Sequence, residues 1–351
     1  MSFHHQLSIA AELAQRKKPC NLQKKDLKLF KKELRRYLPE ISPSIKKKTF
    51  IPPCGKIFNK IFFNKLQLSK NIGFWGIIKS NLKSLFFLSK IRKIKKFQNI
   101  IYVTNSNSHN FFHWFLDVLQ KIEFIEKSRK IILNYKFIII IPVKHNHFYM
   151  RESLKAFNLN FYFQNKNELI VANKSMLIPN LAPTGNYRKK IILNLRNRIR
   201  KRWIKRYYLK KNNTYERIYL SRKGANKRRL QNEDKIISIL KKYKFTILDF
   251  DKIDFIKQLK YIVNSKILIS IHGAGLTHML WMRPKSKVIE IRAKNNCDDN
   301  CYFCLASDLG HKYYYIKANK TDDKRSFHES DLTINTKYFS KQLNSILNVS
   351  L

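Results

Sequence analysis

The sequence predicts an α/β protein whose core is a parallel sheet with helices on both faces. Between residues 217 and 316, strand and helix patterns alternate strictly and are joined by short loops, which is the order of a parallel sheet. Phe137–Ile141 and Ile267–Ile271 are short and almost entirely apolar, as strands in the middle of such a sheet are. A His-Gly-Ala-Gly turn directly follows the second strand, at the edge where parallel sheets bind ligands.

Size and composition allow one large or two ordinary domains, because the chain has 351 residues and 44% of them are hydrophobic. Its five cysteines do not suggest a disulfide framework. No apolar run approaches the roughly 18 residues of a membrane span, and the N-terminus lacks the apolar stretch of a signal peptide. The sequence therefore predicts a cytoplasmic, reducing location.

The chain is strongly basic, with 72 Lys and Arg against 23 Asp and Glu and a formal net charge of +49. This charge fits nucleic acid, an anionic membrane surface or an acidic ligand as partner. It also fits a compositional bias, because Lys, Asn and Ile are abundant throughout and the basic residues are not confined to one tail. No recognised nucleic-acid module is present, so no specific nucleic acid is expected. Peripheral contact with the anionic inner face of the cytoplasmic membrane remains open.

Residues 1–97 form a Lys-rich region of unknown role. Leu27, Phe30, Leu34 and Leu38 recur at helical spacing, which predicts a helix, and a Pro-Pro pair at 52–53 marks a break. Such a basic helix could rest on anionic lipid or pack on the body of the protein. Nothing in this region has catalytic spacing.

A first domain is expected over residues 98–187, beginning with a strand at Ile100–Val103. An Asn/Ser loop then leads into a helix from Phe112, which places His113 and Asp117 four residues apart on one helix face. A histidine held by a carboxylate can act as a general base near neutral pH. The alternative is that His113 only makes a local hydrogen bond. Further short strands are expected at 160–163, 168–171 and 176–179.

A basic helix over 188–211 is expected to connect this domain to a second one, over 212–320, with residues 321–351 as a tail or helix. The second domain carries the alternating pattern. Its expected strands are Arg217–Ser221, Phe245–Leu248, Ile267–Ile271, Val288–Ile291 and Tyr313–Ile316, and its expected helices are Asn232–Lys242, Ile253–Val263, a short one after the turn, and Cys301–Leu309.

The carboxyl ends of these strands bring together residues suited to a diphosphate. One guanidinium group can donate two parallel hydrogen bonds to the oxygens of a phosphate. The N-terminus of a helix favours an anion, and glycines there let the backbone come close to it. A plain tight turn is the alternative for the glycines. The predicted pyrophosphate cradle comprises Arg222, Arg228, Arg229, His272, Gly273, Ala274, Gly275 and Leu276.

Glu290 ends the next strand. A carboxylate in this position can accept the hydroxyls of a ribose, or it can form a local salt bridge.

Three patterns imitate metal sites, and no metal or other cofactor is expected at any of them. Cys297, Cys301 and Cys304 have the spacing of an iron–sulfur motif, but only 47 residues follow the last of them. Asp249-Phe250-Asp251 stands before a helix, whose start favours acids in any case. His145 and His147 lack a third ligand at zinc spacing.

Three blocks in the right order resemble glycosyltransferase family 61, whose members include capsular polysaccharide biosynthesis proteins. They are Asn110-Phe111-Phe112-His113-Trp114-Phe115-Leu116-Asp117, then Tyr219-Leu220-Ser221-Arg222 with Arg229-Leu230-Gln231-Asn232-Glu233, then His272-Gly273-Ala274-Gly275-Leu276-Thr277 with Val288-Ile289-Glu290-Ile291. The resemblance covers roughly residues 98 to 320. Where the family often has Asn, this chain has His278.

The resemblance implies two Rossmann-like domains facing a cleft, the GT-B glycosyltransferase fold. It implies an enzyme that transfers a sugar from a nucleotide sugar, UDP-linked by expectation, to a glycan or lipid-linked acceptor, with inversion and without a metal. The donor would bind the cradle and the acceptor would lie near His113 and Asp117. His113 is the expected base, and His272 is its rival. Because no targeting segment is visible, the chain looks like a bacterial, cytoplasmic member of the family that builds a capsule, lipopolysaccharide or other cell-surface glycan.

Two other classes of function stay open on the sequence. One is a basic nucleic-acid-binding protein, and the other is a scaffold that kept the fold and lost catalysis. The even spread of basic residues argues against the first, and the presence of His113, Arg222 and Gly273 argues against the second.

Overall fold

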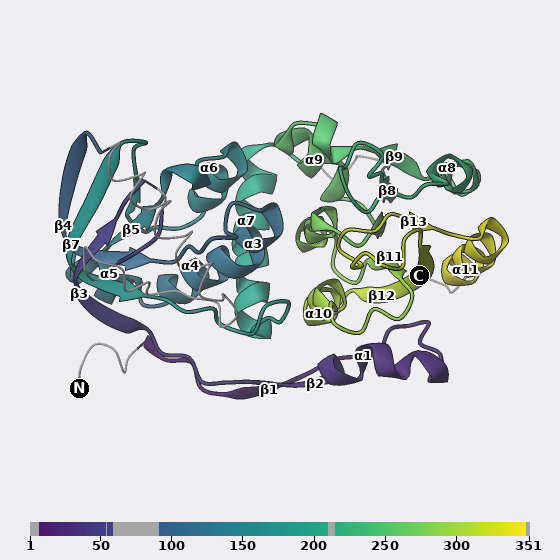
Figure 1. Cartoon of the computed structure of the whole chain (residues 1–351), viewed down its shortest axis with the longest axis horizontal. Coiled ribbons are helices and arrows are strands. Elements are labelled where there is room, and N and C mark those ends of the chain that lie inside the picture. The colour runs from purple at the N-terminus through teal and green to yellow at the C-terminus, as the bar shows by residue number, and fades with distance from the viewer. Residues whose placement is uncertain (1–6, 54, 59–90, 210–214, 349–351) are drawn as a thin grey trace. The chain divides into compact units, whose positions relative to one another are not determined.

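The computed structural model describes residues 7–53, 55–58, 91–209 and 215–348. The chain divides into two compact units, one made of Met1–Glu12 and Pro39–Leu181, the other of Leu13–Leu38 and Ala182–Leu351. Each unit contains its own sheet (Figure 1). The predicted α/β class is confirmed, because both sheets are mainly parallel and are connected through helices.

The sheet of the first unit has five strands in the order β3-β7-β4-β5-β6. They are β3 (Ser44–Ile51), β7 (Glu168–Leu177), β4 (Lys93–Tyr102), β5 (Ile138–Ile141) and β6 (Phe161–Phe163), and only β3 runs antiparallel to its neighbour. Three helices in this unit, α4 (Leu119–Glu126), α5 (Arg129–Asn134) and α6 (Phe148–Leu154), lie between β4 and β6 in the chain. Ile100 and Ile140 are buried in the core of this sheet.

Two details of this sheet differ from the sequence prediction. Residues 168–177 form one ten-residue strand, β7, where two short strands were expected, because the polar residues Asn173 and Lys174 are exposed and do not interrupt the pairing. Residues 44–51, for which the sequence predicted no strand, pair with β7 as β3. This strand contains three consecutive lysines, so it lacks the apolar pattern by which strands are predicted from sequence.

The sheet of the second unit has the order β13-β12-β11-β10-β8-β9. Five parallel strands, β8 (Arg217–Leu220), β9 (Thr246–Leu248), β10 (Ile267–Ile271), β11 (Lys287–Ala293) and β12 (Lys312–Lys320), confirm the predicted set, and the short β13 (Leu332–Thr333) adds an antiparallel edge. The chain order reverses between β8 and β10, which makes their carboxyl ends the topological switch point where open α/β sheets bind ligands.

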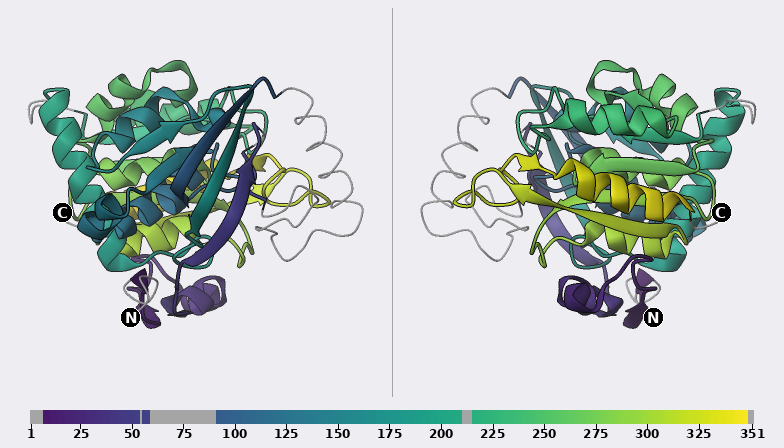
Figure 2. Two further views of the ribbon diagram at one scale, coloured as in Figure 1. Left: turned by 90° about the vertical axis from the view of Figure 1, so that its left-hand side faces the viewer. Right: turned by 90° about the vertical axis from the view of Figure 1, so that its right-hand side faces the viewer.

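Helices of the second unit follow the predicted alternation. They are α7 (Lys189–Arg206), α8 (Glu233–Lys242), α9 (Phe255–Ile262), α10 (Cys301–Asp308) and α11 (Thr336–Asn348), and the short helix after the His-Gly-Ala-Gly turn is the 3₁₀-helix η6 (Ala274–Trp281). Figure 2 shows α11 lying along β12 in its right-hand view, and α11 also contacts α8. No helix in the described residues is long and apolar enough to cross a membrane.

The early segment Leu13–Leu38 belongs to the second unit, although in sequence it lies between the two parts of the first unit. Its helix α1 (Leu27–Leu34) confirms the predicted helical spacing, except that Leu38 ends the following strand β2 (Arg35–Leu38). Phe30 is fully buried, with its ring centroid 5.1 Å from that of Phe303 and 5.1 Å from that of Tyr315. This apolar contact, together with the Arg16–Asp308 ion pair at 3.1 Å, fixes the segment to the sheet.

We expect Phe30→Ala to lower the free energy of unfolding of the second unit by about 3 kcal/mol, because it removes a buried aromatic side chain and leaves a cavity. Leu27→Ala, on the exposed face of the same helix, is the matched control and should change it by less than about 1 kcal/mol. Urea unfolding followed by tyrosine and tryptophan fluorescence measures both. Equal stability of the two variants would contradict the packing of α1 on this unit.

Candidate active site

The turn after β10 and the loop after β8 bring two arginines together. Arg228 Nη1 donates to the carbonyl oxygen of His272 at 3.1 Å, and Arg222 Nη2 donates to the carbonyl oxygen of Lys227 at 3.1 Å. A Cβ added to Gly273 would lie 2.6 Å from Arg222 Nη1. The absence of a side chain at Gly273 therefore gives Arg222 its place against the turn.

The two arginines form a cationic site, because no carboxylate in the described residues is bonded to either guanidinium group. The Glu233 carboxylate accepts only from the backbone N–H of Arg222, at 3.4 Å. Burial, and then the charge of Arg228, lower the pKa of Arg222 below its usual value. The Nε atoms of Arg222 and Arg228 are buried and have no hydrogen-bond partner within the described part of the chain. Like charges held together in this way are typical of a site for an anion, because the anion supplies the missing partner.

The rest of the predicted cradle divides into residues that face this site and residues that do not. Ala274 and Gly275 begin η6 and are partly exposed, so their backbone lies at the helix end that favours an anion. Leu276 is fully buried and can contribute only its backbone. Arg229 points elsewhere, because its guanidinium pairs with Asp331 at 3.0 Å and its backbone N–H donates to the same carboxylate at 2.8 Å.

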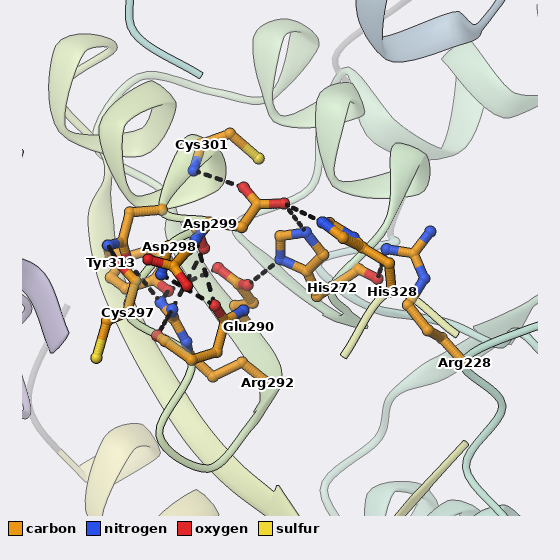
Figure 3. Close-up of polar contacts among 12 residues, drawn as sticks. Arg228, His272, Glu290, Arg292, Cys297, Asp298, Asp299, Cys301, Tyr313 and His328 are labelled. Carbon is orange, nitrogen blue, oxygen red and sulfur yellow. Dashed lines mark hydrogen bonds and ion pairs between the residues drawn. The ribbon is translucent and has the colours of Figure 1, made fainter. Parts of the chain in front are cut away.

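His272 lies between two carboxylates (Figure 3). Its Nδ1 is 2.6 Å from Glu290 Oε1 and its Nε2 is 2.9 Å from Asp299 Oδ2. Burial by itself would lower the pKa of His272, but the charge of Glu290 and the hydrogen bonds to Asp299 and Glu290 raise it above its usual value. Both ring nitrogens therefore act as donors, and the side chain is an imidazolium held beside the turn.

This geometry argues against His272 as the base, because an imidazolium bonded to two carboxylates has no free lone pair for a substrate proton. Glu290 shows the local salt bridge that was the alternative to a ribose contact. It is fully buried, and its other oxygen accepts from the Tyr313 hydroxyl at 2.6 Å. Burial alone would raise the pKa of Glu290, but the charge of His272 lowers it.

Two residues at this edge were missed by the sequence analysis. Asp299 belongs to the loop before α10, where its Oδ1 accepts from the Cys301 backbone at 3.3 Å, and His328 Nε2 lies 3.8 Å from its other oxygen. Asp299 stands in the Cys-Asp-Asp-Asn-Cys stretch, which the sequence analysis considered for its cysteine spacing alone and set aside without a role for its acids. His328 stands in a polar loop without any pattern that singles it out.

His272, Asp299 and His328 also have a geometry that a metal ion could use, since their ligand atoms lie within 4.8 Å of one another. In this structure the imidazolium already uses both carboxylates. A metal ion would have to displace the Nε2 proton of His272, beside the charges of Arg222 and Arg228. An ion-pair network accounts for the cluster without a metal.

The other imitations of metal sites have local explanations. Asp249 accepts from the Asp251 backbone at 3.1 Å at the start of a short 3₁₀ turn. His145 is fully buried, with its ring centroid 6.3 Å from that of Trp114. Among the three cysteines, Cys301 and Cys304 are buried on α10 and Cys297 is exposed.

In the first unit, the predicted His113–Asp117 pair is present. Asn110 caps the helix by accepting from the Phe112 backbone at 2.9 Å, and α3 (Phe111–His113) continues through a π-helical turn, η3 (Trp114–Val118), into α4. His113 Nδ1 is 2.7 Å from Asp117 Oδ2, and the histidine side chain is 22% exposed. The carboxylate fixes Nδ1 as the donor, so Nε2 carries the lone pair that a base needs. Such π-turns are frequent at functional sites.

Comparison with known proteins decides the family. The glycosyltransferase 61 family profile matches residues 111–289. The protein belongs to this family. The matched span includes His113, Asp117, Arg222, Arg228 and His272, and it ends one residue before Glu290. The glycosyltransferase class predicted from the three sequence blocks is confirmed.

Three curated relatives carry the name EGF domain-specific O-linked N-acetylglucosamine transferase. The protein from Drosophila melanogaster is 37% identical over 99 residues, which cover 27% of this chain and 18% of the relative. Those from Gallus gallus and Mus musculus are 30% and 29% identical over 129 residues, covering 35% of this chain and 24% of each relative. The match thus spans less than a quarter of these relatives. They are animal proteins, and the bacterial cell-surface setting stays a prediction.

We expect Glu290→Gln to lower the free energy of unfolding by about 1–3 kcal/mol near pH 6, because it removes one carboxylate from the buried imidazolium. The raised pKa of His272 stabilises the fold below the unfolded value near 6.5 and loses this effect as pH rises through the folded value. The lowered pKa of Glu290 adds stability above the unfolded value near 4.5 and loses it as pH falls.

The difference between wild type and variant should therefore be largest at about pH 5 to 6.5 and smaller at about pH 9. Urea unfolding across this range measures it. Glu329→Gln, which breaks the exposed pair with Lys227, is the control and should have little effect. A difference that does not change with pH would show that His272 is not held as an imidazolium.

Proposed function

We propose that this glycosyltransferase moves a sugar from a UDP-linked donor, with N-acetylglucosamine as the first candidate, to an acceptor hydroxyl, with inversion and without a metal. The observation that carries the proposal is the pair Arg222 and Arg228 beside the His-Gly-Ala-Gly turn, two partly buried arginines whose buried Nε atoms have no hydrogen-bond partner in the described residues. The names of the curated relatives favour N-acetylglucosamine.

In this proposal the second unit binds the diphosphate of the donor. The charge that grows on a departing nucleoside diphosphate must be neutralised by groups already in place. Arg222 and Arg228 supply two positive charges, and the start of η6 supplies backbone N–H groups and the helix dipole. The His272 imidazolium fixes the turn and adds a positive charge close behind it, balanced by Glu290 and Asp299.

The first unit supplies the base in this proposal. His113 would accept the acceptor's hydroxyl proton on Nε2 as the oxygen attacks the sugar carbon and the bond to the diphosphate breaks. Asp117 would orient the ring through Nδ1 and stabilise the positive charge that the ring gains. The structure favours His113 over His272 because only His113 has a nitrogen free of a carboxylate contact.

The acceptor class has two candidates. A glycan or lipid-linked saccharide at the inner membrane face fits the strongly basic chain, which carries a net charge of +49. A hydroxyl on a protein is favoured by the relatives, whose name specifies transfer to EGF domains. Incubation of the enzyme and labelled donor with a lipid-linked saccharide or with a folded EGF domain would separate the two.

The first test is binding and hydrolysis of a panel of nucleotide sugars, measured in EDTA and with added Mn²⁺. We expect saturable binding of one UDP-sugar and slow hydrolysis that is equal in both buffers, because the arginines replace the metal. Arg222→Ala should weaken donor binding at least about tenfold, whereas Lys223→Ala, next to it and paired with Asp234 at the surface, should not. Loss of all activity in EDTA would refute the metal-independent mechanism, and salt-sensitive binding of nucleic acid with no donor binding would refute the transferase role.

We expect His113→Ala to lower kcat about 10²- to 10⁴-fold, the range of general-base catalysis, while the KM for the donor stays within about twofold. Asp117→Asn should have a smaller effect in the same direction, because it leaves the base in place but loosens its orientation. Steady-state kinetics with the identified donor measures both. Near-wild-type turnover of His113→Ala with intact donor binding would remove His113 from the mechanism.

A further inference from the structure

One buried charge in the first unit has no role in the mechanism described so far. Lys121 lies on α4 with only 1% of its surface exposed. Its Nζ donates to the carbonyl oxygen of Val103, the residue that follows β4, at 3.0 Å. Lysine is almost never fully buried unless it is paired, because removing an ammonium from water is costly. A single backbone carbonyl is a weak compensation for that cost.

Asp117 lies one helical turn before Lys121. Burial lowers the pKa of Lys121 to about 8, and the charge of Asp117 opposes this shift. At neutral pH a lysine with this pKa is mainly an ammonium. Glu126, another carboxylate on α4, has an ion pair of its own with Arg129, at 3.5 Å.

The helix places these groups in one row. His113, Asp117 and Lys121 are spaced by four residues along the continuous run of α3, η3 and α4. Side chains four apart in a helix lie on one face. Asp117 therefore stands between the imidazole, at 2.7 Å from its oxygen, and the buried ammonium behind it. The exposed fraction of the side chains falls from 22% at His113 to 9% at Asp117, and Lys121 is deeper still.

We propose that Lys121 is a positioning residue for catalysis, which holds the Asp117 carboxylate turned toward His113. This inference rests on the proposed role of His113. The neighbouring Leu116, Val118, Ile122 and Ile125 are fully buried, and α4 also buries the polar residues Gln120, Glu123 and Glu126, so an apolar side chain would fit at position 121 as well as a polar one. Replacing a buried charge by an apolar side chain of similar length is often neutral or stabilising. In this proposal, the free-energy cost of burying the ammonium is offset by its effect on the His113–Asp117 pair.

The test compares Lys121→Met, which removes both the charge and the hydrogen bond, with Lys121→Gln, which keeps a donor for the Val103 carbonyl and removes only the charge. We expect both variants to lose kcat by about 10-fold or more, with the donor KM within about twofold and the thermal midpoint of Lys121→Met equal to or above that of wild type. Lys127→Met, at the exposed end of the same helix, is the matched control and should turn over like wild type.

A double-mutant cycle with Asp117→Asn separates positioning from general damage. If Lys121 acts through Asp117, Lys121→Met should lower kcat little further in the Asp117→Asn background, because residues that act as a unit are not additive. Multiplicative losses, or full turnover of both Lys121 variants, would overturn the inference. A Lys121→Gln variant that recovers wild-type turnover would assign the residue to the Val103 hydrogen bond alone and would also overturn it.

Failure of the Lys121 proposal and failure of the proposed role of His113 would give different kinetic results. If His113→Ala keeps its turnover, the proposed base is wrong whatever the Lys121 variants do. If His113→Ala is inactive and the Lys121 variants are fully active, only the role of Lys121 fails. Donor binding by calorimetry, which depends on the second unit, should be unchanged in all Lys121 variants in either case.

Discussion

The His272 imidazolium, held between Glu290 and Asp299, is the interaction on which the donor edge of the second unit depends. It joins the end of β10 to the paired strand β11 and ties both to the loop before α10. Its backbone carbonyl also accepts from Arg228 at 3.1 Å. His272 thus holds the turn that begins η6 through its side chain and one of the two arginines proposed to bind the donor through its backbone carbonyl. The residue that resembles a catalytic histidine in sequence acts as a structural cation in the fold.

A second layer of contacts holds the partners of His272 in place. Arg292, fully buried, donates to Asn300 Oδ1 at 2.9 Å and to the carbonyl of Asp299 at 3.3 Å, so it supports the loop that carries Asp299. The guanidinium lies 4.9 Å from the ring centroid of Phe30 on α1, and Asn300 donates to the Leu29 carbonyl at 2.8 Å. A segment near the N-terminus therefore supports the loop at the donor edge, 271 residues later in the chain.

The balance of charge at this edge explains why an anion is expected there. The positive charges of His272 and Arg292 are offset by Glu290 and Asp299, and Arg229 is offset by Asp331. Within the described residues, no carboxylate is bonded to the guanidinium of Arg222 or of Arg228, so the edge keeps a positive surplus. Much of the net charge of the chain is spread over exposed lysines, whose interactions are screened by dissolved salt. The two arginines differ because they are partly buried and adjacent, where an incoming diphosphate interacts most strongly.

Local patterns determined much of this protein. Strand and helix alternation predicted the parallel strands of the second unit, helical spacing predicted α1 and the His113–Asp117 pair, and the glycine turn predicted the site next to Arg222, because each depends only on neighbours a few residues away. Only the tertiary structure decided which charges meet across long stretches of chain. It paired Arg229 with Asp331, buried Glu290 against His272, brought Asp299 and His328 to the same edge, and buried the ammonium of Lys121 against the carbonyl of Val103. The protonation of a histidine and the direction of an arginine depend on groups that sequence spacing does not bring together, so they follow from the fold and not from the motif.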